Sequence, residues 1–384
     1  MAKQFIMPKR IITGKGALEE GKKYLNNFGK KVLIITDKVM VQLGNVKVIT
    51  DILEEEKIEY VIYSEINSEP TDTMIDNGIK LYQMENCNFL IALGGGSPID
   101  SAKAIAAMIT NEGSIADYKG REISNELPPV VAIPTTAGTG SEATQFTIIT
   151  DTKNDVKMLL KGAALLPVLA IIDPRFTVTS PAKVTAATGL DALTHAIEAY
   201  TSRKSQQLSD VFAISAVKRI FKYLPIAFEN PKDLKAREEM ALAALEAGIA
   251  FNNSSVTIVH GMSRPIGALF HIAHGLSNAI LLKECFEYVV DGAYDKFAQL
   301  AREINVVNNE IEDEVAAEIF IKEIGKLIDI LRIPNINELG IDKIKFLNNI
   351  EKMAKDAIES GSPSNTRKII EAKDIINIYN NLWR

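Results

Sequence analysis

Residues 88–100, NFLIALGGGSPID, join a mostly apolar run to three consecutive glycines and a helix-type sequence. A continuous apolar run of this length is typical of a parallel strand buried on both faces. Glycines at 94–96 let the backbone turn sharply and approach a ligand closely. Ser97, Pro98 and Asp100 suit the N-cap, first and third positions of the helix that follows. The stretch therefore predicts a strand, a tight turn and a helix.

The start of this predicted helix is a candidate phosphate-binding site, because free backbone N–H groups there favour a pyrophosphate. The stretch is not a G-x-G-x-x-G motif, since Ile99 occupies the last glycine position, and it is not a Walker loop. A tight, well-capped turn without a ligand explains the glycines equally well. Both interpretations stay open on these residues alone.

Four further runs of strand length lie in the first 180 residues, and helical patterns alternate with them. Such alternation predicts an open parallel α/β sheet with ligands at the carboxyl ends of its strands. Residues 144–150 and 156–160 look like an inserted hairpin. The other predicted strands are 31–36, 60–63, 130–134 and 168–172, and the helices are near 39–56, 72–86 and 98–110.

Two more polar segments directly follow predicted strands. Residues 134–142, PTTAGTGSE, carry four hydroxyls and two glycines, which suit hydrogen bonds to phosphate and ribose but also cap helices. Asp37 follows the strand at 31–36, where an acid can accept hydrogen bonds from the adenosine ribose hydroxyls and repel a 2′-phosphate. A helix N-cap explains Asp37 equally well.

After residues 173–181, DPRFTVTSP, the pattern changes to helical periodicity with few β-branched runs. We therefore expect two domains: an α/β dinucleotide-binding domain with a parallel sheet at 1–180, and an all-α domain at 181–384. The helical patterns cover 182–202, 206–224, 233–250, 275–290, 312–331 and 341–360.

Composition excludes several classes of protein. The 384 residues include 43 basic and 49 acidic ones, a formal net charge of −6, which argues against binding nucleic acid or an anionic membrane. Two distant cysteines cannot form a disulfide framework. Residues 247–282 carry a single formal charge, but their polar residues favour the interior of a soluble domain over a membrane span. With no signal peptide evident, we expect a cytoplasmic protein.

All four histidines lie in the second half of the chain. Asp191 and His195 are four residues apart, so both project from one face of a predicted helix that is apolar nearly all round. An i,i+4 ion pair is the alternative, but a buried carboxylate without a partner is costly.

His260 and His274 are each followed by glycine, and we expect Pro265 and Gly267 to break any single helix between them. A lone buried histidine is usually a satisfied core residue. Histidines and a carboxylate without thiolates favour a divalent Fe or Zn ion. Such an ion can polarise an alcohol oxygen while a nicotinamide accepts the hydride.

At this point the chain resembles the iron-containing (group III) alcohol dehydrogenases over essentially its full length. The matching segments, in the family's order and spacing, are GGGSPIDSAK at 94–103, PTTAGTGSE at 134–142, GLDALTHAIEAY at 189–200, VHGMS at 259–263 and HGLSNAILL at 274–282. The resemblance implies an N-terminal dinucleotide domain, a helical C-terminal domain, and Fe²⁺ (with Zn²⁺ as an alternative) and NAD rather than NADP as cofactors.

The resemblance also implies roles for individual residues. The implied metal ligands are Asp191, His195, His260 and His274. The implied cofactor contacts are Asp37, Gly94, Gly95, Gly96, Ser97, Thr135, Thr136, Thr139, Thr147 and Lys161, and Phe251 matches a substrate-pocket position.

One position departs from the family pattern. Many members carry a histidine four residues after the third ligand, which is thought to assist proton relay, and here that residue is Arg264. Arginine stays protonated and cannot act as a general base. The proton then leaves through water, His271 accepts it, or the activity is altered. We favour release through water and the ribose hydroxyl, with His271 lining the pocket.

We expect an NAD-dependent, metal-dependent alcohol dehydrogenase or aldehyde reductase that acts on small primary alcohols, diols or aldehydes and forms homo-oligomers. One alternative is a lyase like the dehydroquinate synthases, but such an enzyme needs a more basic pocket than residues 247–282 offer. The other is a non-catalytic nucleotide sensor, which only Arg264 favours.

Overall fold

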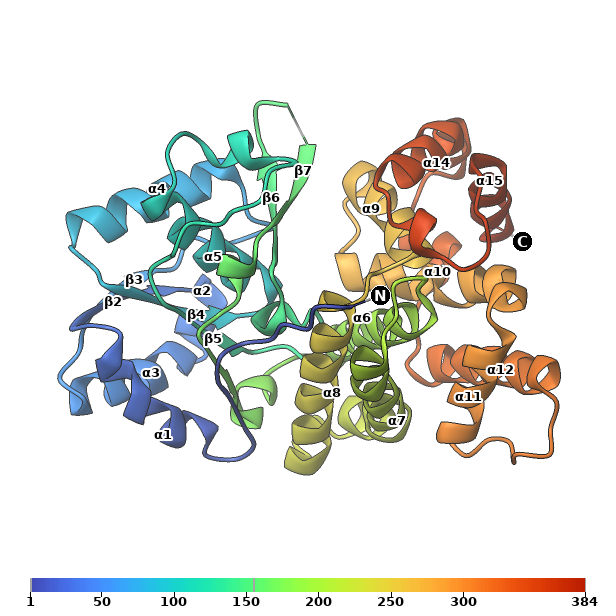
Figure 1. Ribbon diagram of the computed structural model, residues 1–384, viewed down its shortest axis with the longest axis horizontal. Coiled ribbons are helices and arrows are strands. Elements are labelled where there is room, and N and C mark those ends of the chain that lie inside the picture. Colours follow the sequence, from blue (N-terminus) through green and yellow to red (C-terminus); the bar gives the residue numbers. More distant parts are fainter. Residues whose placement is uncertain (1, 155, 384) are drawn as a thin grey trace. The chain divides into compact units, whose positions relative to one another are not determined.

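The computed structural model describes residues 2–154 and 156–383, which divide into two compact units. The first unit comprises residues 6–180 and contains a sheet with helices (Figure 1). The second comprises residues 181–383 together with residues 2–5, and its described residues are built from helices.

Six strands of the first unit form one sheet in which neighbouring strands run parallel, as predicted. Their order across the sheet is β1 (Ile11–Thr13), β8 (Leu169–Ile172), β5 (Val130–Pro134), β4 (Phe89–Gly94), β2 (Lys31–Ile35) and β3 (Glu59–Tyr63). The α-helices of this unit are α1 (Ala17–Gly21), α2 (Lys38–Gln42), α3 (Asn45–Glu55), α4 (Asp72–Met84) and α5 (Gly96–Thr110). From β2 the chain builds outward to β3 and then returns to the other side of β2 as β4. The strand order therefore reverses at β2 and β4, where open α/β sheets bind ligands.

Alternate side chains of β2 explain why its sequence is apolar throughout. Leu33 and Ile35 belong to a buried cluster with residues of α4 and α5, whereas Val32 and Ile34 belong to a second cluster with residues of α1 and α3. All four side chains are fully buried. The sheet is thus covered on both faces, which leaves the ends of its strands as the place for a ligand.

The predicted hairpin is present as the antiparallel strands β6 (Phe146–Asp151) and β7 (Val156–Lys161). The single helix expected near residues 39–56 is two helices, because Gly44 adopts a left-handed conformation with φ 80° between α2 and α3. The capping pattern expected for α5 is also wrong. Gly95 is the N-cap and Ser97 lies inside the helix, because the Asp100 carboxylate bonds to groups outside it.

The helical unit places α6 at its centre, where nearly every residue from Thr185 to the end of the helix is buried. No helix among the described residues is long and apolar enough to span a membrane. The α-helices are α6 (Ala182–Thr201), α7 (Gln207–Glu229), α8 (Leu234–Asn252), α9 (Ile258–Phe270), α10 (His274–Val289), α11 (Tyr294–Glu303), α12 (Asp313–Ile330), α13 (Lys343–Asn348), α14 (Ile350–Glu359) and α15 (Ala372–Asn381).

The expected break at Pro265 and Gly267 is wrong, because α9 continues through both residues and ends at His271. A proline inside a helix removes one hydrogen bond and costs about 3 kcal/mol. Pro265 itself is buried, and so are the first six residues of α9, so tertiary packing offsets this cost. The break falls instead at His271, whose φ of 54° ends the helix.

Candidate active site

The carboxyl ends of β2, β4 and β5 bring three predicted cofactor segments together. The N–H of Thr135, directly after β5, donates to the carbonyl of Gly94 at a distance of 2.9 Å. The hydroxyl of Thr36, directly after β2, donates to the carbonyl of Leu93 at 2.8 Å. The loops that follow these strands are therefore neighbours at one edge of the sheet.

The glycine loop (residues 94–97) and the threonine loop (residues 134–142) lie close together, so a side chain larger than hydrogen would be tightly packed at the three glycines. A Cβ atom on Gly94 would lie 2.4 Å from Cγ of Pro98. On Gly96 it would lie 3.0 Å from Cγ2 of Thr139, and on Gly95 it would lie 3.2 Å from Oγ1 of Thr136. The loop thus exposes backbone N–H groups at the start of α5 without side chains in front of them, as pyrophosphate binding requires.

A fully buried lysine on α5, Lys103, holds residues 141–146 in place through hydrogen bonds. The Lys103 ammonium donates to the carbonyls of Ser141 (2.6 Å), Thr144 (2.9 Å) and Phe146 (2.9 Å). It also contacts the hydroxyls of Ser141 and Thr144 at 3.2 and 3.0 Å. Burial lowers the pKa of Lys103 to about 8, so it remains mainly protonated at neutral pH and ties residues 141–146 to α5.

Two acids accompany this lysine, of which Glu142 is buried and Asp100 is partly buried. The Asp100 carboxylate accepts hydrogen bonds from the Ser141 hydroxyl and from the N–H of Ile148, the latter at 2.9 Å. Burial raises the pKa of Asp100, and it raises the pKa of Glu142 to about 7. Hydrogen bonds from Lys103 and to Asp100 thus connect α5 with residues 141–148, at the start of the hairpin.

The remaining predicted cofactor residues have different surroundings. Asp37 is the N-cap of α2, where one carboxylate oxygen accepts from the N–H of Met40 at 2.9 Å. Thr147 is buried and donates to the carbonyl of Asp100 at 2.9 Å. Lys161 is exposed at the end of β7. Asp37 therefore caps α2, as one of its two interpretations predicted. Its second carboxylate oxygen accepts no hydrogen bond from the described residues.

In the helical unit, Asp191, His195, His260 and His274 form one group whose ligand atoms all lie within 4.8 Å of one another. Asp191 and His195 come from one face of α6, as their spacing predicts, whereas the other two residues come from α9 and from the first position of α10. The rings of His195 and His260 stack with their centroids 4.4 Å apart.

A buried carboxylate fixes the orientation of His260. Glu198, one turn after His195 on α6 and 0% exposed, accepts from Nδ1 of His260 at 2.6 Å. It also accepts from the Thr257 hydroxyl at 2.8 Å and from the N–H of Val259 at 2.6 Å. With Nδ1 as the donor, Nε2 of His260 presents its lone pair, and this atom lies 3.7 Å from Oδ1 of Asp191.

The amide of Asn278 on α10 shows that the ligand atoms converge on one point. Its Nδ2 donates to Oδ1 of Asp191 at 2.7 Å and lies 3.2 Å from Nε2 of His260 and 3.3 Å from Nε2 of His274. A single donor thus contacts three acceptors, which is the arrangement that a cation requires.

The group fits a divalent metal ion by an independent observation. Nδ1 of the buried His195 has no hydrogen-bond partner in the part of the chain that the structure describes. An unsatisfied buried nitrogen costs about 1–3 kcal/mol, and coordination of a metal would satisfy it. Three imidazoles, one carboxylate and no thiolate are a donor set that suits Fe²⁺ or Zn²⁺.

Three other predicted residues lie in the same unit. Phe251 stacks on the ring of His195, with centroids 4.3 Å apart and planes inclined by 18°. Arg264 donates from Nη1 to the Ser362 hydroxyl at 3.2 Å. His271 is exposed at the end of α9 and lies outside the group of ligand atoms.

The sequence interpretation missed three supporting residues: Lys103, Glu198 and Asn278. Lys103 and Glu198 are charged residues within helices that are otherwise buried, and that contrast is a signal that could have identified them. No spacing rule could connect Asn278 to Asp191, because the two residues are 87 positions apart.

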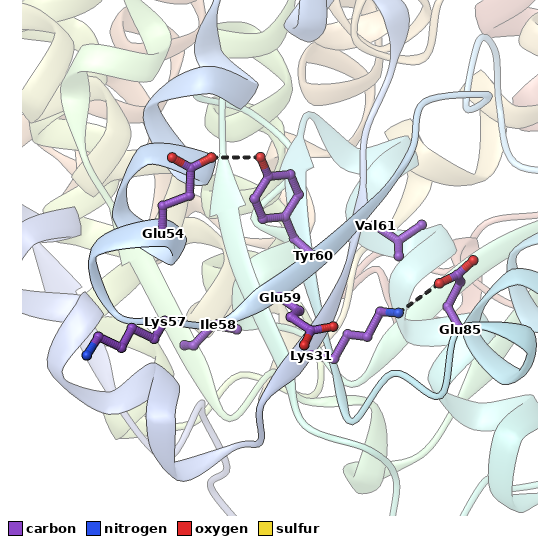
Figure 2. Close-up of a pocket in the computed structure, with 8 residues that line it drawn as sticks. All are labelled: Lys31, Glu54, Lys57, Ile58, Glu59, Tyr60, Val61 and Glu85. Carbon is purple, nitrogen blue, oxygen red and sulfur yellow. Dashed lines mark hydrogen bonds and ion pairs between the residues drawn. The ribbon is translucent and has the colours of Figure 1, made fainter.

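A surface hollow in the first unit lies away from these loops. Figure 2 shows it at the amino ends of β2 and β3, where Lys31 pairs with Glu85 at 2.8 Å and Tyr60 donates to Glu54 at 2.9 Å. These polar groups satisfy each other, and ligands of open α/β sheets bind at the opposite ends of the strands. The hollow is therefore not part of the candidate site.

Comparisons with known proteins agree along the whole chain. A family model described as iron-containing alcohol dehydrogenase matches residues 8–174, and the model of the family's C-terminal region matches residues 185–383. The NAD-dependent methanol dehydrogenase of Bacillus methanolicus is 35% identical over 380 residues, 98% of this chain and 99% of that protein. The 1,3-propanediol dehydrogenase of Citrobacter freundii is 38% identical over 356 residues, 91% of each chain.

A solved structure of a 1,3-propanediol oxidoreductase superposes with a TM-score of 0.96 at 34% identity and covers 100% of both chains. The agreement extends to the parallel sheet, the helical unit and the order of both. The chain therefore belongs to the iron-containing alcohol dehydrogenase family and is an oxidoreductase of that family.

Proposed function

We propose that this protein is an NAD(H)- and metal-dependent alcohol dehydrogenase or aldehyde reductase that interconverts small primary alcohols or diols and the matching aldehydes. The observation that carries the proposal is the buried group of Asp191, His195, His260 and His274, with its unsatisfied ring nitrogen. The activities named for the methanol and 1,3-propanediol dehydrogenases support this substrate class.

In this proposal, residues 1–180 bind NAD and residues 181–384 hold the metal and the reacting carbon. Gly94, Gly95, Gly96 and Ser97 receive the pyrophosphate through the backbone at the start of α5. Asp37 accepts hydrogen bonds from the adenosine ribose hydroxyls and repels the 2′-phosphate of NADP. Lys103 holds the end of the threonine loop in place through its bond to Ser141. The further cofactor contacts are Thr135, Thr136, Thr139, Thr147 and Lys161.

The metal would be held by Asp191, His195, His260 and His274, with Fe²⁺ as the proposed ion and Zn²⁺ as the alternative. When bound, such an ion supplies the Lewis acidity that polarises the alcohol or carbonyl oxygen. Glu198 keeps the proton of His260 on Nδ1, so Nε2 stays available as a ligand. Phe251 covers one face of His195 and excludes water from it.

When bound, the nicotinamide would accept a hydride from the alcohol carbon, and the hydroxyl proton would be released. Arg264 cannot accept this proton, because its guanidinium stays protonated. We propose that the proton leaves through water, since His271 is exposed and lies outside the ligand group. We further propose a cytoplasmic homo-oligomer that requires neither nucleic acid nor a membrane.

Absorbance of NADH tests this function. The purified protein, reconstituted with Fe²⁺ or Zn²⁺, is expected to oxidise NADH with propanal or butanal and to lose this activity after chelation. NADH that stays unchanged with every short aldehyde and either metal would contradict the proposal. Phosphate release from a sugar-acid phosphate without a net change in NADH would favour the lyase alternative, and tight NAD binding without turnover would favour a nucleotide sensor.

A further inference from the structure

Arg264 lies on the same face of α9 as His260. The two residues are four positions apart in a continuous helix, so their side chains are neighbours on its surface. Between His260 and Arg264, Gly261 is covered by Pro363, because a Cβ atom on Gly261 would lie 2.7 Å from Cδ of Pro363. The guanidinium reaches the segment around Pro363, because its Nη1 donates to the hydroxyl of the neighbouring Ser362.

The guanidinium is short of partners. Nη1 donates to the neutral hydroxyl of Ser362 at 3.2 Å, and no carboxylate among residues 2–154 and 156–383 forms an ion pair with it. Arginine carries five N–H donors in a planar fork. The side chain is partly buried, and this burial lowers the pKa of Arg264.

Glu198, the acid whose charge acts on Arg264, already accepts hydrogen bonds from other groups. Glu198 raises the pKa of Arg264 through its charge, yet its two oxygens accept from the Thr257 hydroxyl, the N–H of Val259 and Nδ1 of His260. No aspartate or glutamate occurs between residues 247 and 282, where Arg264 is the single formal charge. The helical segment that carries the guanidinium thus offers it no counter-ion.

A partly buried guanidinium that makes one hydrogen bond and no ion pair with the described residues keeps N–H donors available for an anion. The planar fork of arginine matches a carboxylate or sulfonate through two parallel hydrogen bonds. We propose that Arg264 is a specificity-determining residue that binds an anionic group of the substrate, so that this enzyme acts on short aldehydes or alcohols bearing a carboxylate or sulfonate.

This inference rests on the proposed function and narrows its substrate class. The anionic group takes no part in the reaction: the aldehyde carbon accepts the hydride of NADH and its oxygen gains one proton, while the carboxylate or sulfonate stays bound to Arg264. Turnover of an anionic aldehyde is therefore expected to exceed that of a neutral aldehyde of the same shape through tighter binding, and KM is the constant that differs.

The test compares 4-oxobutanoate with its methyl ester, which differs by the charge, and adds sulfoacetaldehyde as the sulfonate arm. We expect the wild-type enzyme to prefer 4-oxobutanoate over the ester in kcat/KM. Arg264→Met is expected to reduce this preference about 10- to 100-fold, as loss of a charge-assisted hydrogen bond predicts. Arg264→Lys, which keeps the charge without the fork, is expected to retain part of it. The ratio of the two anionic arms identifies the preferred group.

Lys283→Met is the matched control, because it removes a positive charge from α10 that pairs with Glu287 at 3.6 Å outside the ligand group. It is expected to keep the wild-type preference within about twofold, as surface charges contribute little. An unchanged preference in Arg264→Met would overturn the inference. If that variant does not fold, as thermal unfolding would show, the same comparison is decided by Arg264→Lys and Arg264→Gln.

Calorimetric titration of succinate into the enzyme with NADH separates this inference from the proposed function. Succinate binding that Arg264→Met weakens at least tenfold supports the anion site, even in a protein that reduces no aldehyde and so fails the proposed function. Reduction of neutral aldehydes without any succinate binding leaves the proposed function standing and overturns the anion site.

Discussion

At the scale of single residues, Glu198 decides which nitrogen of His260 can bind a metal. Its carboxylate is buried, accepts three hydrogen bonds, and holds the proton on Nδ1. The contact between its Oε2 and Nδ1 of His260, at 2.6 Å, is short for a hydrogen bond. The same carboxylate makes His260 more electron-rich, which strengthens any bond from Nε2.

Glu198→Gln is therefore expected to weaken metal binding about 10- to 100-fold, the usual effect of removing such a partner from a ligating histidine. Competition for Zn²⁺ against a chromophoric chelator measures this without relying on activity. Glu287→Gln, an exposed change on α10, is the control and is expected to bind Zn²⁺ like the wild type. Equal affinity in Glu198→Gln and the control would contradict the role of Glu198.

A second prediction at this scale concerns His271. Because the ring is exposed and lies outside the ligand group, His271→Ala is expected to keep its metal and to change kcat by less than about threefold. Loss of a general acid or base normally costs about 10²- to 10⁴-fold. A loss of that size in aldehyde reduction, with the metal content unchanged, would make His271 the proton relay instead.

Sequence reasoning reached the four grouped residues unevenly. The spacing of Asp191 and His195 places them on one helical face, a local relation that sequence reveals. The positions of His260 and His274 depend on how α9 and α10 pack against α6, which is a long-range relation. Family resemblance connected all four. The role of Glu198 was missed because its partner His260 is 62 positions away, and no sequence pattern connects the two residues.

At the scale of elements, the turn between β4 and α5 is built for close approach. A Cβ atom on Gly94 would meet the ring of Pro98 at 2.4 Å, and that ring cannot move aside without shifting the start of α5. The turn also positions the N–H groups that we propose for the pyrophosphate. We therefore expect even a methyl group added at residue 94 to displace the start of α5.

Gly94→Ala is expected to weaken NADH binding at least about tenfold and to lower the free energy of unfolding by about 1–3 kcal/mol, the usual cost of overpacking. Fluorescence titration of NADH and chemical denaturation measure the two effects. Gly325→Ala on α12, where the new Cβ meets Cδ of Lys283 at an ordinary 3.4 Å, is the control. NADH affinity in Gly94→Ala equal to that of the control would refute the role of this turn.

Element boundaries show where sequence signals stop. The strands were predictable because parallel strands buried on both faces need continuous apolar runs. The expected helix break at Pro265 was wrong because the helix-breaking tendency of proline reflects only the local backbone cost. Burial of α9 outweighs that cost. The prediction of Ser97 as the N-cap of α5 was wrong because Asp100 bonds to Ser141 and Ile148, which are more than 40 residues away. Such distant partners cannot be inferred from capping patterns.

At the scale of the whole molecule, the buried charges give stability a characteristic pH dependence. Burial raises the pKa of Glu142 from an ordinary value of 4.5 to about 7. Between these values the folded state binds more protons than the unfolded state, so this residue lowers the free energy of unfolding as the pH rises. The lowered pKa of Lys103 acts oppositely above about pH 8.

Denaturant unfolding at pH 5 and at pH 7 tests this dependence. The contribution of Glu142 is expected to be about 2 kcal/mol over this range. Glu142→Gln, which cannot ionise, is expected to lose less stability than the wild type between the two pH values. Glu112→Gln, an exposed change in the same unit, is the control and is expected to keep the wild-type slope. A slope in Glu142→Gln as steep as in the control would contradict the assignment.

The central claim is that Asp191, His195, His260 and His274 bind one catalytic divalent ion. Its most direct test is elemental analysis of the purified protein and of Asp191→Ala, paired with NADH oxidation in the presence of butanal. We predict one Fe²⁺ or Zn²⁺ per wild-type chain, and loss of both the ion and the activity in Asp191→Ala. Full turnover by Asp191→Ala, or by wild-type protein stripped of metal, would contradict the claim.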